Sequence, residues 1–244
     1  MTKLGISIVL PTYNERENIR ILIPGIVKTF GHINHEIIVV DDSSPDGTAK
    51  AAEELSEEYD NIKVIVRKKK EGIGAAIREG YNSAKNSIIL SCDSDLSFTL
   101  SDMYGFYEKM QEGYDLVWGS KYSKGSFYEP ETLEGRIKKF ISKSGNKIIR
   151  LVTGIDSYDF TANLRSVRKD VWKQIRTQEK TNTFLMEMIL KCKYEGMRVT
   201  EIPVVFKARV YGESKFNLRV EAPKFLIKMV KYVLLHRFTG YNLS

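Results

Sequence analysis

The sequence predicts an α/β domain whose mainly parallel sheet is covered by helices. Short apolar runs alternate with segments of helical periodicity along the first half of the chain. Strands that alternate with helices in this way form βαβ units, in which neighbouring strands are parallel. The chain has 244 residues, of which 42% are hydrophobic, and no linker rich in Pro, Gly or Ser divides it. It can therefore build one sizeable core.

The first half of the chain alternates regularly between the two kinds of element. The first strand stops at Pro11, and Asn14 is expected to cap the following helix, because Glu17 three residues later completes a capping-box spacing. This helix runs towards Phe30. The expected strands are 6–10, 36–40, 63–66, 87–92 and 114–118. The further expected helices are 48–59, 74–84 and 99–111.

The second half of the chain is less regular. The expected elements are helices at 134–152 and 184–194 and strands at 160–166 and 198–206. The stretch 221–238 is also helical in pattern, with Lys224, Lys228 and Lys231 on one face and a dense set of apolar residues on the rest. Such a helix either lies in a membrane interface, against the bilayer or a small membrane-embedded partner, or packs into the core as an ordinary terminal helix.

Net charge, cysteine count and the length of apolar runs limit the classes of binding partner and cellular location. A net charge of +7 fits nucleic acid, an anionic membrane surface or a phosphate-bearing small molecule. Nucleic acid is disfavoured, because the positive charge is spread along the chain instead of gathered around aromatic platforms. Cys92 and Cys192 are too few for a disulfide framework, which favours a reducing compartment. No run approaches the roughly 20 apolar residues of a bilayer span, and we expect no signal peptide.

Acidic residues follow several predicted strands, at the ends where parallel sheets bind their ligands. The most informative pair is Asp93 and Asp95, directly after the strand at 87–92. Two carboxylates this close repel each other unless a cation lies between them or one is protonated. Mg²⁺ typically binds one or two protein carboxylates and completes its shell with phosphate oxygens and water. The pair therefore favours a divalent-cation site, although strand-end aspartates also serve turns and helix caps.

The turn after the second strand is ambiguous in a similar way. Its first residues are Asp41 and Asp42. A carboxylate at this position can accept hydrogen bonds from a nucleobase or from ribose hydroxyls, as in other nucleotide-binding α/β folds. Asp42 can equally join Ser43, Ser44 and Asp46 in forming the turn and capping the next helix. The two roles are compatible.

A second informative segment is 203–215. A predicted strand leads to Arg209, a glycine permits a sharp turn, and Lys215 follows. Arg offers a planar fork for phosphate oxygens and Lys a compact positive charge; the alternative is an exposed basic loop. Gly72-Ile73-Gly74 lacks the third glycine of a dinucleotide fingerprint, so we interpret it as a tight entry to a helix. The basic run 67–70 is interpreted as solvated, or as a contact for anionic lipid.

A set of motifs occurs in a characteristic order between residues 5 and 216. They are Pro11-Thr12-Tyr13-Asn14-Glu15, VVDDSSPDGT at 39–48, GIGAA at 72–76, Asp93-Ser94-Asp95-Leu96, Gly119-Ser120-Lys121-Tyr122 and RVYGESK at 209–215. Together they resemble the family 2 glycosyltransferases with the GT-A fold, and within that group the dolichol-phosphate mannose synthases and related polyprenyl-phosphate sugar transferases. The resemblance implies inverting transfer of one sugar, with mannose from GDP-mannose expected, to a polyprenyl phosphate, and Mg²⁺ or Mn²⁺ as cofactor.

The resemblance also implies roles for individual residues. Those implied to line the nucleoside pocket are Pro11, Tyr13, Glu15, Val40 and Asp42. Those implied to hold the metal and the sugar diphosphate are Asp93 and Asp95, with Ser94 and Ser97 beside them. Those implied to bind phosphates are Arg209 and Lys215 for the donor, and Lys121 and Arg136 for the acceptor. Residues 1–216 would form the transferase domain, with 1–120 for the donor and 121–216 for the acceptor, and 217–244 an amphipathic terminal helix.

The sequence departs from the family in three places. Ser97 stands where the family usually has Gln, Lys121 where it has Arg, and Tyr158-Asp159-Phe160 where it has Ser-Gly-Phe. These departures keep alternatives open: another donor such as UDP-glucose or UDP-N-acetylglucosamine, a non-lipid acceptor, or nucleotide-sugar binding without turnover. A processive polymerase is disfavoured, because the Gln-x-x-Arg-Trp motif of such enzymes is absent from the sequence.

The implied chemistry needs little acid–base assistance. A phosphate monoester has a second pKa of about 6, so a lipid phosphate is largely dianionic and nucleophilic at pH 7. None of the three histidines lies in a motif. The protein would bring two anionic reactants together and stabilise the departing diphosphate. A lipid acceptor also implies a cytoplasmic protein, bound peripherally at the cytoplasmic face of a membrane.

Overall fold

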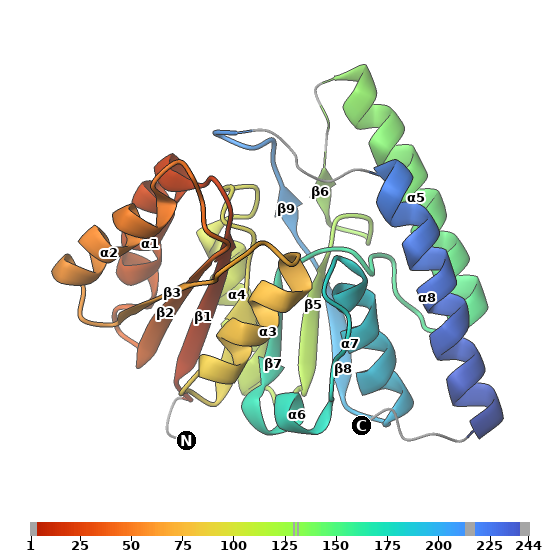
Figure 1. Cartoon of the computed structure of the whole chain (residues 1–244). Coiled ribbons are helices and arrows are strands. Elements are labelled where there is room, and N and C mark those ends of the chain that lie inside the picture. Colours follow the sequence, from red (N-terminus) through yellow and green to blue (C-terminus); the bar gives the residue numbers. More distant parts are fainter. Residues whose placement is uncertain (1–3, 129, 131, 213–217, 240–244) are drawn as a thin grey trace.

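A twisted sheet runs through the centre of the molecule (Figure 1). The computed structural model describes residues 4–128, 130, 132–212 and 218–239. The strands of the main sheet are β1 Ile6–Thr12, β2 His35–Asp41, β3 Ile62–Val66, β4 Ile88–Ser91, β5 Leu116–Ser120, β7 Arg165–Arg168 and β8 Val199–Pro203. Their order across the sheet is β3-β2-β1-β4-β7-β5-β8. A small second sheet pairs β6 (Phe127–Tyr128) with β9 (Val205–Phe206).

The sheet is mainly parallel, as predicted. Strand β1 pairs in parallel with β2 and β4, β2 with β3, and β5 with β8. Strand β7 is antiparallel to both of its neighbours, β4 and β5. Because β7 enters between strands of the first half, it brings the segment before it to the carboxyl ends of β4 and β5.

Helices cover both faces of the sheet (Figure 1). They are α1 Arg16–Phe30, α2 Thr48–Glu58, α3 Ile73–Ser83, α4 Leu100–Gln111, α5 Leu133–Thr153, α6 Lys169–Gln174, α7 Thr183–Tyr194 and α8 Leu218–Thr239. Side chains from α1, α2 and α4 form one hydrophobic core with one face of the sheet. Side chains from α3, α6, α7 and α8 form another core with the opposite face.

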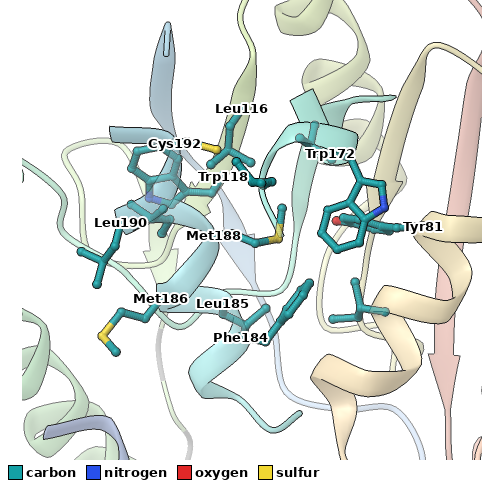
Figure 2. Packing of buried hydrophobic residues seen from close by; sticks show 14 of the residues in the cluster. Tyr81, Leu116, Trp118, Trp172, Phe184, Leu185, Met186, Met188, Leu190 and Cys192 are labelled. Atoms are coloured by element: carbon teal, nitrogen blue, oxygen red, sulfur yellow. The ribbon is translucent and has the colours of Figure 1, made fainter. Parts of the chain in front are cut away.

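The alternation of side chains along the strands assigns them to these two cores. Val9, Ile38 and Val40 point to the face of α3 and α7, where Figure 2 shows Tyr81, Trp172 and Phe184 packed together. Their neighbours in sequence point to the face of α1 and α4; they are Ile8, Leu10, Ile37 and Val39. Both faces of the central strands are buried, which explains their nearly continuous apolar sequence.

The first helix begins differently from the prediction. Asn14 has a positive φ of 57° and does not cap α1, which begins at Arg16. The free N–H groups at the start of this helix are satisfied from the next loop instead: Glu15 N–H donates to Thr48 Oγ1 (2.9 Å) and Arg16 N–H donates to Asp46 Oδ2 (3.2 Å). The capping-box spacing at Asn14 and Glu17 was therefore misleading, because a long-range partner serves the same purpose.

Two predictions in the second half need correction. The strand expected at 160–166 occupies 165–168, because the residues before it are held by side-chain hydrogen bonds rather than by a ladder, as at Asp159 and Thr161. The strand expected at 198–206 is divided between β8 and β9. The short elements β6 and α6 were not predicted, since each is too brief to display a period.

The terminal helix packs against the rest of the molecule and also presents apolar residues to solvent. Phe225, Met229, Tyr232 and Val233 are buried, and α8 contacts both α5 and α7. In Figure 1, α5 and α8 lie side by side at the edge of the molecule. In the described part of the chain, no helix is apolar over a length sufficient to span a bilayer. The division of the chain at 216/217 stays a prediction.

Candidate functional site

The candidate site lies beyond the carboxyl ends of β1, β2, β4 and β5, where open α/β sheets bind ligands. Its centre is the turn after β4. Ser94 donates from Oγ to the carbonyl of Pro11 (3.1 Å), which ties this turn to the end of β1. Asp95 is 3% exposed, and its Oδ1 accepts from the backbone N–H of Ser97 (3.1 Å). Leu96, between Asp95 and Ser97, has a φ of 61° in the left-handed region, so the backbone turns sharply directly after the two aspartates.

The two aspartates repel each other electrostatically. Burial, and after it the nearby charge of Asp95, raises the pKa of Asp93 to about 6. Three groups oppose this effect: a hydrogen bond from Asn163 and the positive charges of Lys121 and Arg209. A carboxylate pair of this kind is stabilised by a divalent cation, which neutralises both charges.

Arg209 lies directly against the acidic pair. Its Nε is 3.0 Å from Asp95 Oδ2, and its Nη1 is 3.9 Å from Glu15 Oε1. The segment that carries it follows β9 and crosses to α1, where Asn18 Nδ2 donates to the carbonyl of Tyr211 (3.4 Å). The fork of Arg209 is thus held at the place where a diphosphate would meet a cation. Lys215, predicted to act beside it, lies outside the described residues.

The predicted nucleoside residues lie along β1 and β2. Val40 pairs with Pro11 in the parallel register of these strands. The side chain of Val40 is fully buried in the core against α3, so only its backbone is available to a ligand. Glu15 is tied down by Asn18, whose Nδ2 donates to Glu15 Oε2 (2.6 Å). That Val40 lines a nucleoside pocket therefore stays a prediction, and such a contact would be made by its backbone.

The loop after β2 serves both the turn and the site. Asp41 accepts from Thr12 Oγ1 (3.0 Å) and from Ser44 N–H (2.8 Å), so this residue shapes the turn. Asp42 is 5% exposed and binds the guanidinium of Arg67. Burial raises the pKa of Asp42, and the charge of Arg67 opposes that shift.

Only the first residue of the basic run after β3 departs from the predicted solvated run: Lys68, Lys69 and Lys70 are exposed as predicted, whereas Arg67 is buried. Arg67 is 7% exposed and pairs with Asp42, Glu71 and Glu79 at once. The ammonium of Lys70 lies 3.6 Å from the centre of the Tyr13 ring. Arg67 and Lys70 thus contact Asp42 and Tyr13, two of the residues predicted to line a nucleoside pocket. The signal was present in the sequence: Arg67 directly follows a parallel strand, at the edge of the sheet that binds ligands.

Lys121, predicted to face the acceptor, lies directly after the end of β5. Its Nζ lies 3.5 Å from Asp159 Oδ2 and 4.9 Å from the centre of the Phe206 ring. Asp159 is fully buried and also accepts from the N–H and the hydroxyl of Thr161. Arg136 is exposed on the first turn of α5, and no contact among the described residues joins it to Asp93 or Lys121. The importance of Asp159 was not predicted, because its partner is distant in sequence.

The donor set fits a divalent cation that completes its shell with ligand oxygens. In the described ranges, no cluster of three or more His, Cys, Asp or Glu side chains could hold a metal by itself. Asp93 and Asp95 supply two carboxylates, a number typical of Mg²⁺ sites that use substrate phosphates. The hydroxyl of Ser97 is buried beside them and has no hydrogen-bond partner in the structure. Such an unsatisfied oxygen fits a site that a ligand or ion completes.

The glycines at the start of α3 have a structural role. Gly72 has a φ of 108°, and a Cβ there would lie 2.5 Å from the carbonyl oxygen of Lys180. A Cβ on Gly74 would lie 2.5 Å from the Cβ of Phe184. The interpretation of Gly72-Ile73-Gly74 as a tight helix entry is therefore confirmed.

This combination of fold and site defines a transferase of the GT-A type, with a nucleotide-binding sheet and an acidic pair at the end of a central strand. Residues 7–176 match the family described as Glycosyl transferase family 2. The chain belongs to this family.

Two curated relatives cover most of the chain. A dolichol-phosphate mannosyltransferase of Pyrococcus furiosus is 34% identical over 216 residues, which are 88% of this chain and 60% of the relative. A polyprenol monophosphomannose synthase of Mycolicibacterium smegmatis is 30% identical over 222 residues, which are 86% of this chain and 80% of the relative. The chain thus spans about three fifths of the Pyrococcus protein's length.

Solved structures support the same architecture. Glucosyl-3-phosphoglycerate synthase from Mycobacterium tuberculosis, in complex with Mn²⁺, UDP and glucosyl-3-phosphoglycerate, superposes with a TM-score of 0.72 at 16% identity, covering 94% of this chain and 80% of that one. Mannosyl-3-phosphoglycerate synthase from Rubrobacter xylanophilus superposes with a TM-score of 0.71 at 18% identity, covering 95% and 74%. At these identities the likeness establishes the fold.

Proposed function

We propose that the protein transfers a single mannose from GDP-mannose to a polyprenyl phosphate such as dolichyl phosphate, with inversion at the anomeric carbon and with Mg²⁺ or Mn²⁺ bound. The observation that carries the proposal is the acidic pair of half-buried Asp93 and buried Asp95, with Arg209 3.0 Å from Asp95 and the charge of Lys121 acting on Asp93. Such a site suits a cation together with phosphates. The names of the two curated relatives supply the sugar and the lipid acceptor.

The donor is held from two sides in this proposal. Asp42, Glu15, Pro11 and Tyr13 surround the nucleoside, while Asp93 and Asp95 hold the metal. A divalent metal held there would neutralise charge on the diphosphate and so make it a better leaving group. Arg209 contributes a fixed positive fork to the same oxygens and needs no reorganisation during the reaction. The release of Arg209 from Asp95 would accompany loading of the site.

Transfer then depends on placing the acceptor phosphate. Lys121 orients one phosphate oxygen towards the anomeric carbon; the new C–O bond forms on the face opposite the diphosphate, and the bond to the diphosphate breaks with its electron pair. No general base is required, because the acceptor is already ionised. The described histidine side chains fit this view: His35 contacts the carbonyl of Ile33 and the amide of Asn61, at the opposite end of β2.

A lipid acceptor requires a membrane-facing surface, and α5 with α8 supplies a candidate. We name the exposed apolar side chains of these two helices the apolar surface. Its members are Leu133, Ile137, Phe140, Ile141, Ile148, Leu151 and Val152 on α5, and Leu226, Ile227, Val230 and Leu234 on α8. Many exposed apolar side chains on two adjacent helices are typical of a membrane or protein contact. Peripheral attachment through it would bring the lipid phosphate to Lys121, and the cytoplasmic face remains part of the proposal.

A product assay tests the proposal. The purified chain is incubated with Mn²⁺ or Mg²⁺, with GDP-mannose, UDP-glucose or UDP-N-acetylglucosamine, each labelled in the sugar, and with dolichyl phosphate, an oligosaccharide or 3-phosphoglycerate. We expect an organic-soluble mannosyl phospholipid from GDP-mannose alone, which is lost when EDTA is added. A product with another sugar or a water-soluble acceptor would overturn the assignment. Calorimetric binding of a nucleotide sugar without any product would instead support a binding protein.

A further inference from the structure

A buried chain of hydrogen bonds leads from the core to Asp93. The hydroxyl of Tyr81 lies 2.8 Å from Ser91 Oγ, which donates to Asn163 Oδ1 (3.1 Å) and to the Asn163 carbonyl (3.2 Å). Asn163 Nδ2 donates to Asp93 Oδ1 (3.0 Å). Tyr81, Ser91 and Asn163 are exposed by 1%, 0% and 2%. This series of hydrogen bonds therefore connects the hydrophobic core to Asp93 through residues that solvent does not reach.

Each hydrogen-bond donor in this series points towards Asp93. An ionised carboxylate accepts hydrogen bonds and donates none, so the amide nitrogen of Asn163 must face Asp93 and its Oδ1 must face Ser91. The single proton of Ser91 is used towards Asn163, which leaves Tyr81 as the donor to Ser91. Hydrogen bonds aligned in this way polarise one another, and buried networks with every member satisfied fix a unique geometry.

Packing and further hydrogen bonds hold both ends of this hydrogen-bond series, at Asn163 and at Tyr81. Arg165 is fully buried and donates to the carbonyl of Ala162 and, from Nη1, to the carbonyl of Leu185 (2.7 Å), so it fixes the backbone on which Asn163 sits. The ring of Tyr81 packs edge-on against Trp172 at 4.9 Å between centroids, as Figure 2 shows. Asn163 can therefore adjust little when Asp93 changes its partners.

We propose that Asn163 is a positioning residue for the metal site. By holding Oδ1 of Asp93, it fixes the orientation of the carboxylate and leaves the other oxygen for a divalent cation. Residues that hydrogen-bond to metal-ligating side chains typically contribute 10- to 100-fold, roughly, to metal affinity. The inference rests on the proposed function, since it assumes that Asp93 is a ligand, and it adds a residue to which neither the family motifs nor the net charge point.

Binding of Mn²⁺ tests this inference without any reliance on turnover. Free Mn²⁺ is measured by electron paramagnetic resonance during titration of the wild type, Asn163→Ala and Tyr81→Phe. The matched control is Asn146→Ala: Asn146 is equally buried (2%) and accepts from the Phe160 N–H (2.9 Å), but it does not contact Asp93. We expect Asn163→Ala to weaken Mn²⁺ binding by about 10- to 100-fold, and Tyr81→Phe to weaken it less. Asn146→Ala should lower the melting temperature and leave Mn²⁺ affinity unchanged.

The outcomes separate the inference from the proposed function. Wild-type Mn²⁺ affinity in folded Asn163→Ala overturns the inference, as does an equal loss in Asn146→Ala, which would make the effect one of general stability. If Asn163→Ala does not fold, Tyr81→Phe decides, because it keeps the ring and removes only the first donor: unchanged affinity overturns the inference and weakened affinity supports it. A wild type that binds no Mn²⁺ overturns the metal in the proposed function, and this inference with it.

Discussion

At the scale of single residues, Asp95 is the side chain on which the site depends most directly. Its two oxygens have different partners: Oδ1 accepts from Ser97 N–H at 3.1 Å, and Oδ2 pairs with Arg209 at 3.0 Å. The first contact shapes the turn, and the second is an ion pair. Asp95→Asn keeps an oxygen for the turn and removes the charge, so it separates fold from function better than Asp95→Ala.

We predict that Asp95→Asn lowers the transfer rate by about 100-fold or more at saturating Mn²⁺, because the developing negative charge on the diphosphate loses part of its compensation. Its melting temperature without metal should stay close to that of the wild type. Initial rates and thermal unfolding measure the two effects, with Asp60→Asn, an exposed aspartate, as the control. Near-normal turnover in Asp95→Asn would contradict the metal assignment.

A second prediction concerns Asp159, which holds Lys121. Asp159→Asn keeps an acceptor for Thr161 but leaves the Lys121 ammonium without its buried charge partner, so Lys121 is freer to move. We expect kcat to fall about tenfold through loss of positioning, while KM for polyprenyl phosphate is unchanged or lower, because the site gains net positive charge. The control is Asp156→Asn, an exposed acid of the same loop that pairs with Arg150. A raised KM with normal kcat would refute the positioning role of Asp159.

At the scale of elements, one carboxylate makes polar contacts that help to hold α8 against the rest of the molecule. Glu179 accepts from the Tyr232 hydroxyl (3.1 Å), the Lys228 ammonium (2.8 Å) and the Thr183 hydroxyl (3.0 Å). Although burial alone would raise the pKa of Glu179, these partners lower it below its ordinary value of 4.5. Lys228, expected on a lysine face, thus serves to attach the helix.

The sign of the pKa shift predicts how this attachment depends on pH. A carboxyl whose folded-state pKa is lowered stabilises the fold above its unfolded pKa and loses that contribution as pH falls through the folded value. We therefore expect Glu179→Gln to be less stable than the wild type at pH 7, with the difference shrinking below about pH 4.5. Urea unfolding at several pH values measures this difference, and exposed Glu53→Gln is the control. A difference that stays constant with pH would argue against the ionic role of Glu179.

Regular elements were predictable and irregular ones were not, for physical reasons. Buried parallel strands such as β1 and β2 are nearly all apolar, and α3 or α4 has a full helical period, so local sequence specifies them. Strand β7 depends on an antiparallel fit between β4 and β5 that no local pattern encodes. In the site, Asp93 and Asp95 were predictable because they directly follow a parallel strand, at the edge of the sheet that binds ligands. The contacts of Asn163 with Asp93 and of Asp159 with Lys121 were not predictable, because they join segments 70 and 38 residues apart.

At the scale of the whole molecule, the predicted donor site and the apolar surface lie towards opposite edges of the main sheet. The donor site lies over β1, β2 and β4, while α5 and α8 lie at the opposite side (Figure 1). Lys121, directly after β5, lies between them. Its pairing with buried Asp159 links β5 to the segment that follows α5. Under the proposed function, a water-soluble donor and a lipid acceptor would approach from different directions and meet near Lys121.

The proposed membrane contact through the apolar surface leads to a testable prediction. Ile227 on α8 and Leu151 on α5 are 67% and 73% exposed, so replacing them with Asn should not disturb the core. Loss of the apolar burial of one such side chain costs about 1.5 to 3 kcal/mol when it is fully inserted. We expect Ile227→Asn with Leu151→Asn to reduce binding to vesicles of mixed neutral and anionic lipid by tenfold or more, roughly.

Flotation of the full chain with such vesicles measures this effect, and Ile21→Asn on α1 is the matched control, because Ile21 is 50% exposed and lies on the donor side. These substitutions leave the net charge at +7, so electrostatic attraction to anionic lipid is the same in every variant. If the double variant floats like the wild type while Ile21→Asn does not, the apolar surface is not the membrane contact. If all variants float equally and high salt releases them, positive charge rather than apolar burial holds the protein at the bilayer.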